Sequence, residues 1–348
     1  MSNRAKSGAV SINSKRKNVM FLLLLFVLLI IAVVISLWAG SYSTTFKDII
    51  QGVFNKAPDD KINAVVRKVR LPRIFTALVA GAGLGVSGCI LQAILNNPLA
   101  SASTLGVSQG AVFGAAFAII GLGANSLKHG SFLITICSFG ASMGVALVIM
   151  GLAKLKQITP ESIVLAGVAI SSLFTGATTL LQYFADEVQL TSLVFWTFGD
   201  LGSTNWKQIR LMAIVVFIIS IYFIIHRWDF NALLSGKETA ISLGVNVKKT
   251  TIINMILCCF MASTVVSYIG LINFIGLVAP HMVRMVVGNN YVYLIPGSIL
   301  AGSLLLLLGD LLSRMVISPV ILPIGAITSF LGAPLFLYLL FRRGGNNA

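Results

Sequence analysis

The side chains that could carry out acid–base, nucleophilic or metal chemistry are few and dispersed. The three histidines, His129, His226 and His281, lie far apart, and no group of Cys, His and Asp has the spacing of a metal site. The pair Gly236-Lys237 is followed by Glu238 instead of Ser or Thr, so it is not a phosphate-binding loop. No nucleophile, base and orienting group converge. We therefore expect no catalytic residue, metal or cofactor in this chain, and any ATP-Mg to bind a partner subunit.

Ionisable residues are also scarce inside the apolar runs, where burial in lipid is costly unless the residue has a function. Asp310 and Arg314 are four residues apart, so they share a helix face on which they can pair. The four cysteines lie inside apolar runs without a CxxC spacing, which predicts small hydrophobic side chains.

The composition identifies the elements that must hold these residues. Of 348 residues, 57% are hydrophobic and 10% charged, and the mean hydropathy is +0.95. Soluble domains carry about 25% charged residues, so a soluble globular protein is excluded, as are a disordered chain and a disulfide-rich scaffold. The net charge of +15 comes from basic residues between apolar runs, which favours membrane orientation and lipid headgroups over nucleic acid. The sequence predicts an all-α polytopic membrane protein.

Apolar runs separated by polar breaks predict about ten transmembrane helices, because a bilayer core needs about 20 apolar residues per helix. The uncharged stretch from Ile74 to Leu127 is divided at Asn96-Asn97-Pro98, which reads as a turn. The eighth helix is short, as expected where backbone lines a cavity instead of lipid. The predicted spans are 19–39, 71–95, 104–124, 131–153, 160–184, 208–226, 250–272, 274–287, 291–316 and 319–341.

The order of the spans predicts an orientation. Residues 1–18 form a basic tail, and the apolar run that follows is too long for a signal peptide, so we expect an uncleaved first span. Ten spans then place this tail and the tail 344–348 in the cytoplasm, with a single transmembrane domain over 19–343. The distribution of Lys and Arg favours this orientation weakly, because the basic run Arg67–Arg73 falls on the outer side.

The cytoplasmic segment at about 227–249 is too short to span and too amphipathic for a plain linker. Ala240, Ile241 and Leu243 predict a short helix with one apolar face. Two interpretations stay open at this point: an interfacial helix that lies on lipid, or a docking element for a cytosolic partner.

Six motifs in a fixed order resemble the permease subunits of bacterial and archaeal ABC importers for iron chelates (siderophores, haem) and cobalamin. The resemblance covers about residues 60–343, and Ala102 departs from it where family members commonly carry proline. The motifs are Leu71-Pro72-Arg73, Gly88 to Ala100 with Gln92 and Asn97-Pro98-Leu99-Ala100, Leu165-Ala166-Gly167, Trp196 to Gly199, Phe274 to Arg284, and Leu322-Pro323-Ile324-Gly325 followed by Gly332-Ala333-Pro334.

The resemblance implies the architecture of a type II ABC importer permease. Two permease subunits, here a homodimer, would surround one pathway, and spans two to five and seven to ten would form an inverted repeat. Two cytosolic ATPase subunits and an extracytoplasmic substrate-binding protein would complete the transporter. The cargo would be a ferric siderophore, haem or cobalamin, carried across the cell membrane by alternating access.

The resemblance also implies roles for residues near the two membrane surfaces. Outer-face arginines would meet acidic residues of the binding protein, where charge pairing sets encounter rate and orientation; the alternative is contact with lipid headgroups. These arginines are Arg70, Arg73 and Arg314. The segment 227–249 would couple to the ATPase, with Leu243 as an apolar knob and Gly244 ending the helix. The coupling residues are Glu238, Ala240, Leu243 and Gly244.

The pathway itself is expected to be small and weakly polar, because tight binding belongs to the delivery protein. The pathway candidates are Gln92, Ser171, Ser172, Thr175 and Thr178. The cytoplasmic gate is placed near Thr159, Pro160 and Glu161, although Pro160 is also a suitable first residue of a helix.

Other classes of membrane protein compete with the importer. An ion-coupled secondary transporter of a small hydrophilic solute is disfavoured because carboxylates are nearly absent within the spans. A scaffold or receptor would not need the amphipathic cytoplasmic segment, and an integral-membrane enzyme lacks a convergent site.

Overall fold

The computed structural model describes residues 2–40, 42, 45–155 and 160–344, and within them it contains helices and no strand. Among these residues, seven helices are long and apolar enough to cross a membrane, and three shorter apolar helices bring the number to ten. They follow the ten predicted spans one for one, which confirms the all-α fold class. The ten are α1 (Ser2–Trp38), α4 (Leu71–Ile94), α5 (Val107–Ala116), α6 (Gly130–Leu155), α7 (Pro160–Tyr183), α9 (Trp206–Ile225), α12 (Val247–Ile269), α13 (Ile275–Val287), α14 (Tyr291–Met315) and α15 (Ile324–Gly344).

Two predicted boundaries differ from the structure because of proline. The second span is longer than predicted: α3 (Asp60–Ala64) and a π-helical turn, η1 (Val65–Arg70), run directly into α4. Pro72 has no N–H to donate to the preceding turn, and a widened π turn accommodates that loss. The last span is predicted from residue 319 but begins at Ile324, directly after Pro323.

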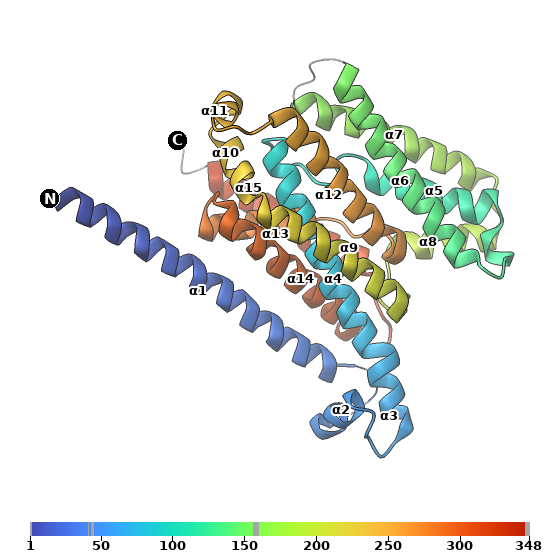
Figure 1. The fold of residues 1–348 in the computed structure, drawn as a ribbon. Coiled ribbons are helices and arrows are strands. Elements are labelled where there is room, and N and C mark those ends of the chain that lie inside the picture. Colours follow the sequence, from blue (N-terminus) through green and yellow to red (C-terminus); the bar gives the residue numbers. More distant parts are fainter. Residues whose placement is uncertain (1, 41, 43–44, 156–159, 345–348) are drawn as a thin grey trace.

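Short helices mark the two ends of the bundle (Figure 1). One end carries α2 (Phe46–Val53) and α3, and the other carries α10 (Arg227–Leu234) and α11 (Lys237–Ser242). The helix α2 starts at a capping box, in which Thr45 and Asp48 satisfy each other's backbone N–H groups. The Thr45 hydroxyl also donates to Asp48 Oδ2 at 2.6 Å, and this bond, with the one from the Thr45 backbone N–H, lowers the pKa of Asp48. Between the long helices lie η2 (Phe117–Gly121), η3 (Ala124–Ser126) and α8 (Glu187–Phe198).

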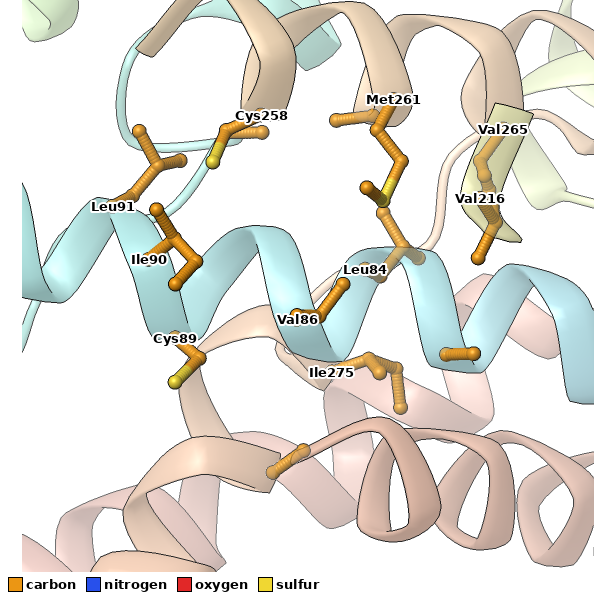
Figure 2. Close-up of a cluster of buried hydrophobic side chains, with 14 of the residues drawn as sticks. Leu84, Val86, Cys89, Ile90, Leu91, Val216, Cys258, Met261, Val265 and Ile275 are labelled. Carbon is orange, nitrogen blue, oxygen red and sulfur yellow. The ribbon is translucent and has the colours of Figure 1, made fainter. Parts of the chain in front are cut away.

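The helix α4 forms the centre of the bundle and is buried along most of its length. Glycines allow this, because a Cβ on Gly81 or Gly88 would collide with the backbone of Gly302 or Gly276. Such close backbone approach is how small residues pack helices within membranes. Figure 2 shows side chains of α12 facing α4, with Cys258 beside Leu91. The cysteines of this core are free and buried, as predicted for small hydrophobic side chains.

The helices on either side of this centre differ in how much they are covered. The helix α5 packs against α6 and α7 and contacts α8 and α12, forming the group on the right of Figure 1. The helix α1 packs mainly along α14, and most of its side chains from Val19 to Trp38 remain exposed. Large apolar side chains on α1, α7 and α9 are therefore available to lipid or to another subunit.

Candidate functional site

At the end of the bundle that carries α2, one buried carboxylate joins two helices. Asp310 on α14 is fully buried; its Oδ1 lies 2.6 Å from Arg73 Nε on α4, and its Oδ2 lies 3.0 Å from Arg314 Nε on α14. The predicted pairing of Asp310 with Arg314 is therefore confirmed. Arg73 also approaches Asp200 at 3.6 Å, in the segment between α8 and α9. Removing one partner of a buried ion pair leaves an uncompensated charge, which costs about 3–5 kcal/mol.

Two arginines at this end of the bundle, Arg70 and Arg314, hold the end of α1. Arg70 donates to the carbonyl oxygens of Leu37 at 2.7 Å and Tyr42 at 2.6 Å. Arg314 donates to the carbonyl of Ala39 at 2.9 Å and to the hydroxyl of Ser36 at 2.6 Å. The last carbonyls of a helix have no partner within the helix, and here cationic side chains satisfy them. The arginine cluster thus ties α1, α4 and α14 together.

This arrangement limits how accessible the three predicted docking residues are to a partner protein. Arg70, Arg73 and Arg314 do lie at one end of the molecule, but their side chains are largely buried and bonded within the chain. A partner's carboxylate would have to compete with these bonds. Docking through the three arginines therefore stays a prediction. Asp200, which directly follows the Trp196–Gly199 motif, was not predicted from the sequence.

The pathway candidates on α7 divide between two faces. Thr178 is buried and Ser171 half-buried, and Ser171 lies close to Gly106 at the start of α5. Ser172 and Thr175 are exposed. The hydroxyls of Ser171, Ser172 and Thr178 donate to carbonyls one turn earlier in α7, which lowers their polarity toward a passing solute.

Gln92 lies apart from this set, on α4, one turn after the close contact of Gly88 with Gly276. It is buried, and neither atom of its amide has a hydrogen-bond partner within the described residues. An unpaired buried amide is costly.

The predicted gate falls largely outside the described residues. Thr159 is not among them, and of Pro160 and Glu161 the structure describes the backbone as the first turn of α7. Pro160 is the first residue of this helix, as the alternative interpretation predicts. Among the described residues, no three His, Cys, Asp or Glu side chains group as metal ligands do.

At the opposite end, α11 presents apolar side chains. Ile241 and Leu243 are 62% and 66% exposed, while Ala240 is fully buried and anchors the helix. Glu238 is exposed. Gly244 adopts a positive φ of 86°, a conformation that favours glycine, and α11 has ended by this residue as predicted. The arrangement offers an exposed apolar face on a short, anchored helix.

Aromatic packing fixes this segment to the bundle. Phe230 of α10 is fully buried between Phe223 of α9, at a centroid distance of 6.2 Å, and Tyr291 of α14, at 5.8 Å. The Asn231 side chain accepts from the backbone N–H of Tyr291 at 2.9 Å and donates to Asn290 at 3.2 Å. These contacts join α10, which directly precedes α11 in the chain, to α9 and α14. The sequence analysis did not single out these residues.

The fold is that of a polytopic helical membrane protein. The sequence model of the FecCD transport family matches residues 28–342, and the chain belongs to this family. An ABC transporter permease protein of Methanocaldococcus jannaschii is 46% identical over 94% of this chain and 95% of the relative. A solved structure described as an inward-facing conformation of a metal-chelate type ABC transporter has a TM-score of 0.81 and 33% identity, covering 93% of this chain and 99% of that chain.

Two further relatives differ in the cargo for which they are named. The molybdate import system permease protein of Haemophilus influenzae is 36% identical over 92% of this chain and 95% of its own length. The hemin transport system permease protein of Yersinia pestis is 32% identical over 92% of this chain and 96% of its own length. Membership of the family makes this chain the permease subunit of an ABC importer, in which a separate subunit hydrolyses ATP, and this removes the secondary-transporter and scaffold alternatives.

Proposed function

We propose that this permease carries an iron chelate, a ferric siderophore or haem, inward by alternating access, with cobalamin as the related alternative. The observation that carries the proposal is the exposed face of α7, where Ser172 and Thr175 provide weak polarity and α7 carries no charged side chain from Ser162 to Tyr183. Such a face lets a bulky chelate pass without holding it. Molybdate is a second candidate, because a relative of comparable identity is named for it.

In the proposed transporter, two copies of the chain face each other and enclose the pathway between them. The end with α2 and α3 faces the extracytoplasmic substrate-binding protein, and the end with α11 faces the cytosol together with both chain termini. Ile241 and Leu243 then enter a groove of the ATPase. The Phe230 and Asn231 contacts pass the movement of the ATPase to α14.

Uptake into proteoliposomes tests this function. The permease is reconstituted with the ATPase and the binding protein that are encoded next to it in the genome. A ferric siderophore, haem, cobalamin and molybdate are supplied in separate reactions. We expect ATP-dependent accumulation of a chelate that an uncoupler does not abolish. Accumulation of molybdate alone would assign the second candidate, and uptake that requires an ion gradient while ATP is present in excess would overturn the proposal.

A further inference from the structure

The helix α2 exposes an apolar ridge that no other described element covers. Phe46, Ile50 and Phe54 follow at four-residue intervals, so they share one face, and they are 60%, 47% and 69% exposed. The opposite part of the helix packs inward, where Ile49 and Gly52 are buried. Lys47 and Gln51 lie on a third, polar side. Three such sectors are typical of a helix that lies at a membrane interface.

The depth of α2 follows from its contacts. Gly52 packs against Val66, whose Cγ2 would lie 3.0 Å from a Cβ at that glycine. Arg70, one turn further along the same helix, bonds to the carbonyls of Leu37 and Tyr42 at the end of the first span. One helical turn rises about 5.4 Å, and the headgroup layer is roughly 5–8 Å thick on each side of the hydrocarbon. These contacts place α2 roughly one helical turn from the end of the first span.

A groove with both charged and apolar lining adjoins the ridge. It has a volume of about 640 Å³ and lies between the end of α2, α3, η1 and the first residues of α4 and α9. Arg67 and Lys68 are exposed and form no ion pair within the described part of the chain. The lining residues are Val53, Asn55, Asp60, Asn63, Ala64, Arg67, Lys68, Leu71 and Trp206.

Aromatic side chains at this end support an interfacial position. Trp38 at the end of α1 and Trp206 at the start of α9 are 60% and 40% exposed, and tryptophan is enriched where membranes meet water. The Trp206 indole N–H donates to the carbonyl of Arg67 at 3.3 Å, and its ring packs on Phe75 at 5.5 Å. The hydrogen bond from Trp206 to the Arg67 carbonyl thus fixes the wall of the groove and does not involve the Arg67 side chain.

We propose that α2 and this groove form a lipid site: the Phe46–Ile50–Phe54 ridge enters the acyl boundary of the adjoining leaflet, and Arg67 and Lys68 hold a phospholipid phosphate. The apolar lining residues contact the lipid where its headgroup meets the acyl chains. The carboxylate of Asp60 in the same groove suits an amine or hydroxyl of the headgroup. This site is independent of the cargo and of the ATPase.

The first test measures the depth of α2 in nanodiscs of phosphatidylethanolamine and phosphatidylglycerol. Nitroxide labels are attached at Ile50→Cys on the ridge and at Lys47→Cys on the polar side. The unsubstituted protein serves as the control for labelling of the native Cys137, which is only partly buried. We expect oxygen to raise the spin relaxation rate of the label at 50 more than a water-soluble nickel complex does, and the label at 47 to show the reverse. A label at 50 that prefers nickel, or one protected from both reagents by another protein surface, would overturn the proposal.

The second test counts bound lipid by native mass spectrometry of the full-length protein. The Arg67→Gln/Lys68→Gln variant should lose a phospholipid that the unsubstituted protein retains. The matched control, Lys248→Gln/Lys249→Gln, removes the same charge from exposed residues at the other end and should retain it. Unchanged retention in the groove variant, with an unchanged melting temperature, would contradict the groove as the headgroup site.

Discussion

The charge on Asp310 is the residue-scale feature on which one end of the molecule depends. This fully buried carboxylate bonds to both Arg73 and Arg314. Arg314 in turn bonds to Ser36 and Ala39 at the end of α1, so the ion cluster links α1, α4 and α14. The spacing of Asp310 and Arg314 predicted their pairing, but Arg73 lies far away in sequence, and only tertiary packing brings it to the same carboxylate.

Asp310→Asn is expected to destabilise the protein by about 3–5 kcal/mol, because it leaves the buried Arg314 guanidinium without a carboxylate partner and Arg73 with only the exposed Asp200. The control is Asp200→Asn, since Asp200 is 54% exposed and 3.6 Å from Arg73, and exposed pairs contribute about 0–1 kcal/mol. Unfolding in detergent, followed by intrinsic fluorescence, compares the two. Equal losses of stability in both variants would contradict a special role for Asp310.

Glycine spacing on α4 provides a second test at this scale. Gly88→Ala places a Cβ against the backbone of Gly276, where no side chain can yield, so we expect a loss of about 1–3 kcal/mol or more. Gly140→Ala on α6 meets no atom within 4 Å and should stabilise by about 0.5–1 kcal/mol, because alanine is the better helix former. Opposite signs in the unfolding free energy are the expected result.

At the scale of elements, hydrophobic runs were sufficient to predict all ten apolar helices in order. Helix boundaries were less predictable where proline acts through the backbone. A π turn before Pro72 lets the helix continue through this residue, whereas α15 begins only after Pro323. The short helices were harder still. The amphipathic pattern of α11 could be predicted from the sequence. The contacts of Phe230 and Asn231 that anchor the α10–α11 segment depend on Tyr291, some sixty positions away.

The proposed coupling role of α11 has its own test. Leu243→Asp replaces an exposed apolar side chain with a charge, so the helix should still fold but lose its ATPase partner. Leu243→Met keeps the apolar volume and should retain the partner. Copurification from detergent, followed by ATPase activity in nanodiscs, measures both variants. Normal association of the Asp variant would place the ATPase contact elsewhere in the segment 227–249.

At the scale of the whole molecule, α7 presents the face that a second copy would cover in the proposed transporter. The single subunit leaves Ser172 and Thr175 exposed on α7 together with large apolar side chains such as Leu165 and Leu173. Lipid alone would favour an entirely apolar face, whereas a pathway shared with a second copy needs weakly polar groups next to an apolar contact surface. The sequence predicted these residue types but not their division, because Ser171 and Thr178 turn toward the protein interior.

The exposed position of Thr175 on α7 gives the sharpest test of the proposed pathway. Thr175→Trp should lower uptake of a bulky chelate by roughly tenfold or more, since a steric barrier of about 1.4 kcal/mol already has that effect. Val148→Trp, on an exposed apolar position of α6, adds the same ring away from the proposed pathway and should transport normally. ATPase activity should persist in both variants, so the block is placed in the pathway and not in assembly. If the cargo is molybdate, its small size predicts a weaker block, and equal uptake by all three proteins would place the pathway on another face.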